Sequence, residues 1–248
     1  MSAKISLFTS LFKGAKHLQG FLEDIENQTI FKECELIIIN ANSPEKEEEE
    51  AILKPFLEKY SNIYYSALEN DPGVYAVWNL GVKKCSSDLI SNANVDDRKH
   101  PEHLEKHYQV LLDNPDIDLA YANVAVTYKP NETMDKHTAV LVHNFPEYSF
   151  LNLLKYNMPH NNPVWRKSIH DKNGYFREDM ISAADFDMWL RAATNESKFK
   201  KVEGVLGLYY KSPEGVSTKS ETLNEAVAEV NKLREEYMHK VDYRELSL

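Results

Sequence analysis

The sequence predicts an α/β protein with a mostly parallel central sheet flanked by helices. Short apolar runs alternate with stretches of helical periodicity along the first part of the chain. The run CELIIIN, residues 34–40, is mostly apolar, as expected for a strand covered on both faces of a sheet. Strands that alternate with helices imply parallel pairing through right-handed crossovers. The 248 residues are enough for one such domain.

The strands are predicted from apolar runs bounded by polar or turn-forming residues. They lie at residues 4–12, 34–40, 62–68, 87–94, 117–128 and 204–210. The segment between the last two, from 129 to 163, is less regular because proline and asparagine recur in it. In parallel sheets ligands bind beyond the carboxyl ends of the strands, so the strand ends are where a site is expected.

The helices are predicted from apolar spacing and capping residues, at 15–29, 43–60, 74–85, 100–115, 149–157, 184–196 and 221–237. Ser43 offers an N-cap and Pro44 the first-turn position of the second helix. The glutamates that follow indicate a solvated helix start near the positive end of the helix dipole. We expect one domain over 1–218 and a helical extension over 219–248, which packs on the domain or at a homodimer interface.

Charge and composition disfavour several classes of protein. The formal net charge of −10 disfavours nucleic-acid binding. Cys34 and Cys85 are the only cysteines, too few for a disulfide framework, which favours a reducing, cytoplasmic location. No stretch approaches the roughly 20 apolar residues of a membrane span, although association with the cytoplasmic face of a membrane is compatible with this. The short apolar run after Lys4 favours a first strand over a signal peptide.

Asp96 and Asp97 follow the predicted strand at 87–94. Two adjacent carboxylates repel each other unless a cation or hydrogen bonds offset the charge. Mg²⁺ or Mn²⁺ does so while staying open to phosphate oxygens, so the pair predicts a metal cofactor and a nucleoside-diphosphate substrate. The alternative is an exposed turn in which Asp96 caps the next helix.

Several motifs occur in an order that resembles the family-2 glycosyltransferases of the GT-A fold. They are ISLFTS, ENQTIFKECELIIINANS, DPGVYAVWNLGVKKCSSDLISNANVDD, HNNPVWRKSIHDKNGYFRED and SAADFDMWLR, which span roughly residues 4 to 215. The resemblance implies a Rossmann-like GT-A domain that transfers a sugar, with inversion, from a nucleoside-diphosphate donor to a hydroxyl acceptor. It also implies a role in polysaccharide or glycoconjugate synthesis, with a sugar, lipid-linked glycan or protein as the acceptor.

The resemblance assigns roles to the acidic residues and to the first strand. Asp97 would be the metal ligand and Asp96 a contact to the donor sugar or ribose. Asp185 would be the general base that deprotonates the acceptor, although Ala184 replaces the glutamate that usually precedes it. The alternative for Asp185 is capping of its own helix. Thr9, at the end of the first strand, would begin the nucleoside contacts.

At the end of the second strand the sequence departs from the family. The usual pair of aspartates is replaced by Asn40, Ala41 and Asn42. Alanine cannot accept the hydrogen bond that uracil donates, whereas an asparagine amide can both donate and accept. Asn40 or Asn42 is therefore the expected contact to the base of the donor, which need not be uracil.

Four further residues complete the predicted donor site. Gly73 would permit close backbone approach to the nucleotide, and Tyr75 and Asn79 would face the donor from the next helix. Packing of Tyr75 into the core is an equal alternative. Arg166 would bind the diphosphate, with an ordinary salt bridge as its alternative. His100, His103 and His107 share a helix face, but no fourth ligand for a metal is evident.

The sequence thus predicts a metal-dependent hexosyltransferase. Two alternatives stay open. One is a GT-A-fold binding module that has lost turnover, which the Ala41 replacement favours. The other is a metal-dependent nucleotidyltransferase, for which the sequence lacks the expected glycine-rich basic loop.

Overall fold

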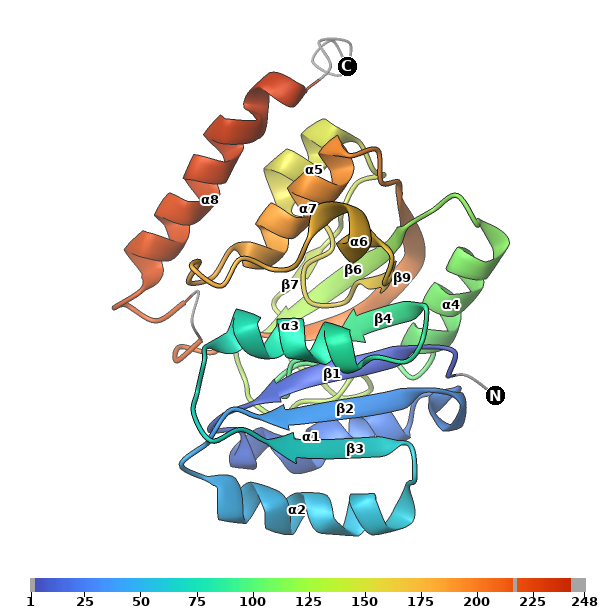
Figure 1. The fold of residues 1–248 in the computed structure, drawn as a ribbon, viewed down its shortest axis with the longest axis vertical. Coiled ribbons are helices and arrows are strands. Elements are labelled where there is room, and N and C mark those ends of the chain that lie inside the picture. The colour runs from blue at the N-terminus through green and yellow to red at the C-terminus, as the bar shows by residue number, and fades with distance from the viewer. Residues whose placement is uncertain (1–2, 216–217, 242–248) are drawn as a thin grey trace.

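The computed structural model describes residues 3–215 and 218–241 (Figure 1). Within them a nine-stranded sheet has the order β3-β2-β1-β4-β8-β6-β9-β5, and β7 pairs with β6. The strands are β1 (Ser6–Leu11), β2 (Glu35–Asn40), β3 (Ile63–Ala67), β4 (Leu89–Asn92), β5 (Arg98–Lys99), β6 (Leu119–Thr127), β7 (Leu141–His143), β8 (Val164–Arg166) and β9 (Phe199–Tyr210). The α/β class and the central sheet are confirmed.

The helices connect these strands. They are α1 (Ala15–Glu26), α2 (Lys46–Lys59), α3 (Val74–Lys84), α4 (His103–Asp113), α5 (Phe150–Tyr156), α6 (Ile169–Asn173), α7 (Ala184–Thr194) and α8 (Leu223–Tyr237), with short 3-10 turns at Phe31–Glu33 and Met238–Lys240. The predicted C-terminal helix is therefore present as α8, which packs against α5 and α7. Residues 242–248 of the predicted extension lie outside the described part of the chain. No helix in that part is long and apolar enough to cross a membrane.

The sheet divides into a parallel half and a mixed half. Strands β1, β2, β3 and β4 pair in parallel, so their carboxyl ends lie at one edge. Strand β8 runs antiparallel to both β4 and β6 and so joins the halves, and β6 pairs in parallel with the long β9. The loop after β4 returns through β5, which pairs with β9. This pairing brings the end of β9 beside the predicted aspartate pair.

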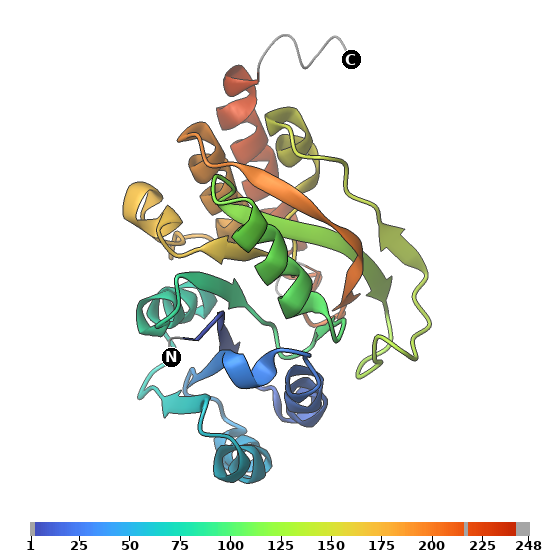
Figure 2. The same ribbon diagram turned by 90° about the vertical axis from the view of Figure 1, so that its right-hand side faces the viewer.

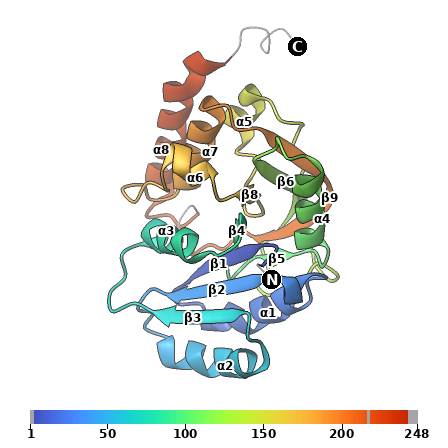
Figure 3. The same cartoon turned by 45° about the vertical axis from the view of Figure 1, so that its right-hand side comes forward.

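Alternate residues of the central strands face two separate cores. Leu7 of β1 belongs to a cluster that α1, α2 and α4 complete, whereas Phe8 belongs to a cluster with α3, α5, α6 and α7. Figure 2 shows α4 along β6 and β9, and Figure 3 shows α3 on the opposite side of β1 and β2 from α1 and α2. Helices on both faces explain why the β2 strand is buried along its whole length.

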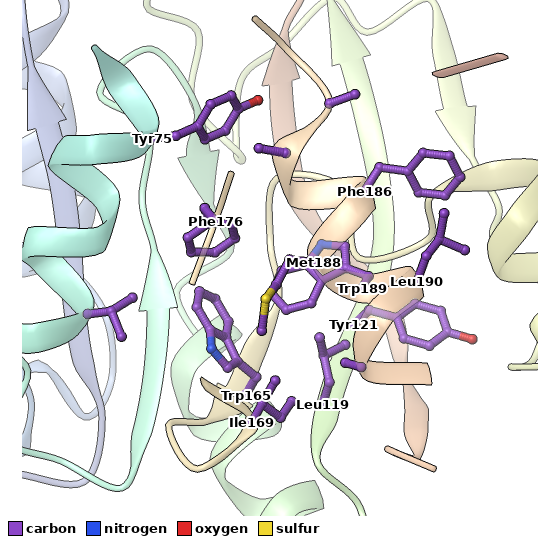
Figure 4. Packing of buried hydrophobic residues seen from close by; sticks show 14 of the residues in the cluster. Tyr75, Leu119, Tyr121, Trp165, Ile169, Phe176, Phe186, Met188, Trp189 and Leu190 are labelled. Atoms are coloured by element: carbon purple, nitrogen blue, oxygen red, sulfur yellow. The ribbon is translucent and has the colours of Figure 1, made fainter. Parts of the chain in front are cut away.

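An aromatic cluster fixes α7 on the sheet (Figure 4). The indole rings of Trp165 and Trp189 lie edge to face with centroids 5.1 Å apart, and Phe176 packs edge-on against both. Trp165 belongs to β8 and Trp189 to α7. Buried aromatic pairs of this kind hold elements at defined distances. The cluster therefore sets the position of the helix whose first turn carries Asp185.

The structure corrects the interpretation of the glutamate run at the start of α2 as entirely solvated. The Glu49 side chain is fully buried. Its carboxylate accepts hydrogen bonds from the Gly14 backbone N–H, the Ser43 hydroxyl and the Asn40 amide. Helix α2 also begins later than predicted, at Lys46, so Ser43 is not its N-cap residue. The Ser43 hydroxyl accepts a hydrogen bond from the Glu45 N–H. Buried carboxylates need such partners, and sequence spacing alone does not reveal them.

The strands β5, β7 and β8 were not predicted. Each spans two or three residues, too few for a periodic signal, and β8 lies in the proline- and asparagine-rich segment. Their pairing depends on the long strands β6 and β9 beside them. The mixed half of the sheet is thus the part that local sequence predicts least well.

His103 and His107 are buried in α4 and pack ring against ring, with centroids 4.1 Å apart. They do not form a metal face. Neither ring nitrogen of His103 has a well-formed hydrogen bond among the described residues. Burial, followed by the charges of its neighbours, lowers the pKa of His103 well below 6.5, and burial lowers that of His107 to about 3. Both rings are therefore neutral in the folded protein.

This neutrality predicts sensitivity to acid. Below pH 6.5 the unfolded chain binds a proton at each ring and the folded chain does not, so the free energy of unfolding falls by about 1.4 kcal/mol per pH unit per histidine. Between pH 6.5 and 5, the free energy of unfolding of His103→Leu should fall less steeply with decreasing pH than that of wild type, by the share of one histidine. Urea unfolding at each pH measures this slope. His137→Leu is the control, because that ring is exposed. Equal slopes for wild type and His103→Leu would mean that His103 is protonated in the fold.

Candidate functional site

A cavity of about 540 Å³ lies at the carboxyl ends of the parallel strands, between the two halves of the molecule. Its walls come from α3, the loop after β4, the segment between α5 and β8, the start of α7, the end of β9, and α8. The side chains that line it include Tyr75, Trp78, Asn92, Asn94, Asp96, Asn157, His160, Asn161, Asp185, Phe186, Tyr209, Tyr210 and Arg234. Carboxylates, carboxamides and aromatic rings in one cavity are the groups that bind and activate a polar organic substrate.

Asp96 and Asp97 point in different directions. Asp96 lines the cavity, whereas Asp97 does not and is only 6% exposed. One oxygen of Asp97 accepts a hydrogen bond from the Asn94 amide at 3.0 Å, and the other accepts from the Tyr210 backbone N–H at 3.0 Å. Asp97 therefore joins the loop after β4 to the end of β9. The predicted role of metal ligand does not fit this orientation.

The electrostatics of the pair follow from burial. Burial, and then the neighbouring charge of Asp97, raise the pKa of the Asp96 carboxyl to about 7. Burial also raises the pKa of Asp97, while its hydrogen bonds and the charge of Lys99 act in the opposite sense. Lys99 is itself buried, and its pKa is lowered to about 8. The lysine charge thus acts on Asp97, whereas His17 and Arg98 act on Asp96 and offset only part of the rise in its pKa.

The residues around Asp96 fit a divalent cation that is only partly held by protein. No group of three or more histidine, cysteine or acidic side chains is placed to hold a metal ion anywhere in residues 3–215 and 218–241. Mg²⁺ and Mn²⁺ are commonly held by one or two carboxylates together with substrate phosphates. Asp96 supplies one such carboxylate, and the side-chain amides of Asn92 and Asn94 lie on the same cavity wall.

Asp185 lies in the first turn of α7 and lines the cavity. One of its carboxylate oxygens accepts a hydrogen bond from the Asn157 amide at 3.1 Å. Burial raises the pKa of Asp185, and this hydrogen bond partly counteracts the shift. Burial raises the pKa of the Tyr75 phenol, and the charge of Asp185, which lies close by, raises it further. A carboxylate with a raised pKa is suited to accept a proton near neutral pH.

The segment between α5 and β8 contributes side chains that the sequence interpretation did not single out. Asn157 ends α5 in the left-handed conformation, with φ of 44°, and its amide contacts Asp185. His160 and Asn161 line the cavity and belong to the motif HNNPVWRKSIHDKNGYFRED of the family resemblance. Burial lowers the pKa of His160 to about 4, so its ring is neutral. The asparagine directly after a helix is the one sequence signal for Asn157.

The residues predicted on α3 have different positions. Tyr75 lines the cavity and is also packed against Trp78, with centroids 5.4 Å apart, so the ring belongs both to the core and to the cavity wall, and its contact with the donor stays a prediction. Gly73 is exposed, with φ of 91°, a conformation that favours glycine at the start of this helix. Asn79 does not line the cavity. Its amide donates to the Phe176 carbonyl and its oxygen accepts from the Phe176 N–H, which ties α3 to the segment before α7.

The residues predicted at the ends of β1 and β2 are mostly buried. Thr9 is 2% exposed, and its hydroxyl is 3.4 Å from the Ser10 carbonyl. Asn40 is fully buried, donates to Glu49 and accepts from the Ser43 N–H. Asn42 is exposed in the left-handed conformation, with φ of 56°. Of the two asparagines, Asn42 is the one whose amide is free to meet a base.

Arg166 lies at the opposite edge of the sheet from the cavity. It pairs with Leu89, the first residue of β4, because β8 runs antiparallel to β4. Its guanidinium donates to the backbone carbonyls of Leu111, Asn114 and Ile117 and so caps the end of α4. This position does not fit the predicted contact with the diphosphate, nor the alternative of a salt bridge.

Comparison with known proteins agrees with this geometry. The sequence profile of the family described as glycosyl transferase family 2 matches residues 6–177, more than half of the chain. The chain belongs to glycosyltransferase family 2. An uncharacterised glycosyltransferase of Methanocaldococcus jannaschii is 30% identical to this transferase over 204 residues, 80% of the chain and 67% of the relative. The O-antigen biosynthesis glycosyltransferase WbnJ of Escherichia coli is 27% identical over 203 residues, 75% of the chain and 70% of the relative.

Solved structures show the same fold. TarS of S. aureus in complex with UDP-GlcNAc has a TM-score of 0.74 at 18% identity, covering 94% of the transferase and 65% of the TarS chain. The mannosyltransferase PcManGT of Pyrobaculum calidifontis, in complex with GDP-Man and Mn²⁺, has a TM-score of 0.67 at 12% identity, with coverage of 94% and 65%. The transferase thus spans less than two thirds of the length of either solved chain. The GT-A fold is confirmed.

Proposed function

We propose that the transferase moves a hexose, with inversion, from a nucleoside-diphosphate donor to a hydroxyl acceptor. The observation that carries this proposal is the presence of two carboxylates, Asp96 and Asp185, in one cavity at the carboxyl ends of the parallel strands. An accessible carboxylate at the end of β4 suits the charged end of the donor, and the carboxylate at the start of α7 suits the acceptor. The carboxamides and aromatic rings between them suit a sugar.

Asp185 is the general base of the proposed reaction. It takes the proton of the acceptor hydroxyl while the acceptor oxygen bonds to the anomeric carbon and the bond from that carbon to the diphosphate oxygen breaks. The products are the glycoside, the nucleoside diphosphate and a proton on Asp185. A single displacement inverts the anomeric carbon and needs no covalent intermediate. The Asn157 amide orients the carboxylate and stabilises its charged form.

Asp96 is the proposed residue for Mg²⁺ or Mn²⁺, in place of Asp97. A divalent cation bound there would offset the charge of the diphosphate that leaves. Asp97 has a different proposed role, which is to hold the loop so that Asp96 faces the cavity. The GDP-Man and Mn²⁺ found together in PcManGT support the use of a divalent cation with a nucleoside-diphosphate donor.

For the donor we propose a contact to the base and the class of sugar, and for the biological setting a type of synthesis. Asn42 is the proposed contact to the base, because Asn40 is buried and Ala41 has no polar side chain. The bound molecules of the solved neighbours, UDP-GlcNAc and GDP-Man, support a hexose donor. The O-antigen role of WbnJ supports a place in polysaccharide or glycoconjugate synthesis.

Calorimetric titration with UDP, GDP, CDP and dTDP, each with and without Mn²⁺, tests the proposal. We expect one of them to bind at least about tenfold more tightly with Mn²⁺, because the cation links Asp96 to the diphosphate. The matching sugar nucleotides are then assayed for transfer to water or to simple sugars. If no nucleotide binds with or without Mn²⁺, the protein is better explained as a binding module. Release of pyrophosphate from a nucleoside triphosphate and a sugar phosphate would instead support a nucleotidyltransferase.

A further inference from the structure

The C-terminal helix α8 forms one wall of the cavity, although it lies beyond the residues that the family profile matches. It crosses beside α5 and α7 (Figure 1). Its buried side chains are Ala226 and Leu233, and Val230 and Tyr237 pack partly buried against the core. Two charged side chains, Glu229 and Arg234, add polar contacts to the neighbouring helices.

Glu229 binds the backbone just before α7. One carboxylate oxygen accepts from the Ile181 N–H at 2.6 Å, and the other accepts from the N–H groups of Ser182 and Ala183 at 2.9 and 3.1 Å. The N-cap residue of α7 is Ala183, which has no side-chain oxygen with which to cap the helix. The Glu229 carboxylate instead binds three successive backbone N–H groups that lead into α7, the last of them that of the N-cap residue, near the positive end of the α7 dipole.

Arg234 makes the complementary contact at the end of α5. Its guanidinium donates to the carbonyl of Leu154 at 3.1 Å and to that of Lys155 at 2.8 Å. These carbonyls belong to the last turn of α5, where carbonyl groups lack helical partners and a cation is favourable. Helix α8 therefore binds the start of one helix through an anion and the end of another through a cation.

The two anchored segments carry the pair of side chains that meets in the cavity. Asp185 follows the Glu229 contact by two residues, and Asn157 follows the Arg234 contact by two residues. The Asn157 amide and the Asp185 carboxylate are joined by a hydrogen bond of 3.1 Å. By binding both segments, α8 fixes the relative position of these two groups. Without it, that position would depend on the backbone of the short α5 helix and of its left-handed last residue.

We infer that Glu229 and Arg234 are positioning residues for the general base, so that α8 is part of the catalytic unit of the transferase. This inference rests on the proposed role of Asp185. A displacement of about 1 Å in a reacting group can reduce a rate about a hundredfold, so loss of either contact acts on turnover. Donor binding depends on the opposite wall of the cavity, around Asp96, and is unaffected.

The first experiment is a kinetic cycle between Glu229→Gln and Asp185→Asn in the full chain. Glutamine keeps the size of the side chain but directs an amide N–H toward a backbone N–H. We expect kcat of Glu229→Gln to fall by about ten- to a hundredfold with the Kd for the bound nucleoside diphosphate unchanged. In the Asp185→Asn background the same change has no further effect, because residues that act as a unit are not additive. Arg234→Met is expected to behave in the same way.

The control is Glu225→Gln, which removes the same charge from an exposed position one turn earlier on α8. Its kcat is expected to match wild type. A kcat of Glu229→Gln equal to wild type, or a loss that is undiminished in the Asp185→Asn background, would overturn the inference. A purely structural role predicts the second of these outcomes.

Amide hydrogen exchange separates this inference from the proposed function. It is measured on the protein without ligand, so it needs no turnover. We expect exchange at residues 181–187 to accelerate in Glu229→Gln and not in Glu225→Gln, and exchange at 154–158 to accelerate in Arg234→Met. If wild type transfers no sugar and these segments still accelerate, the proposed function fails and the positioning by α8 stands. Unchanged exchange in both segments refutes the positioning.

Discussion

Asp185→Asn is expected to reduce kcat by about 10²–10⁴-fold, the range that a positioned general base contributes. An asparagine amide fills the same space and can still meet Asn157, so the fold and the binding of the nucleoside diphosphate should be retained. The measurement is steady-state transfer with the donor identified by titration, together with calorimetric binding of its nucleoside diphosphate. The loss should appear in kcat and kcat/KM and not in the Kd of the nucleotide.

The pH dependence of the same variant gives an independent check. The raised pKa of Asp185 means that its carboxyl is protonated, and unable to act as a base, up to a pH above the ordinary value for aspartate. Wild-type kcat should therefore rise with pH through that pKa, and Asp185→Asn should lose this acid limb. Asp187→Asn is a poor control, because Asp187 is buried and pairs with Arg191. Asp179→Asn removes an exposed carboxylate whose ion pair with Arg177 is open to solvent, so it should leave kcat unchanged. Near-wild-type transfer by Asp185→Asn would refute the assignment.

Asp96→Asn is expected to weaken metal-dependent nucleotide binding by about a hundredfold, because it replaces the one carboxylate at the end of β4 that faces the cavity. Binding measured without Mn²⁺ should change little, since that affinity does not involve the cation. Calorimetric titration of the nucleotide in both conditions measures the difference.

Asp97→Asn is the matched variant, because it removes the adjacent charge. Its side chain can accept one hydrogen bond but not both of those from Asn94 and Tyr210. We expect the free energy of unfolding to fall by about 1–3 kcal/mol, while much of the metal-dependent binding survives. If Asp97→Asn abolishes that binding in a folded protein and Asp96→Asn retains it, Asp97 is the metal ligand, as the family resemblance implies.

Much of the parallel half of the fold could be predicted from local sequence. Apolar strands and amphipathic helices alternate there, and β1, β2 and β3 pair in the order in which they follow one another along the chain. The mixed half was harder, because β8 joins β4 and β6 through short pairings between segments far apart in sequence. The glutamates of α2 show the same limit, since the partners of Glu49 come from the residue before α1 and from the end of β2.

A helix-flanked sheet, an aspartate pair beyond one strand and an aspartate at the start of a later helix can all be predicted from local sequence. Which of these groups meet in one cavity depends on how the chain folds. Asp97 is turned inward by Tyr210 and Arg166 caps a distant helix. Helix α8 completes the wall beside Asp185. The physical reason is that a polar side chain is oriented by its hydrogen-bond partners, and here those partners come from segments far away along the chain.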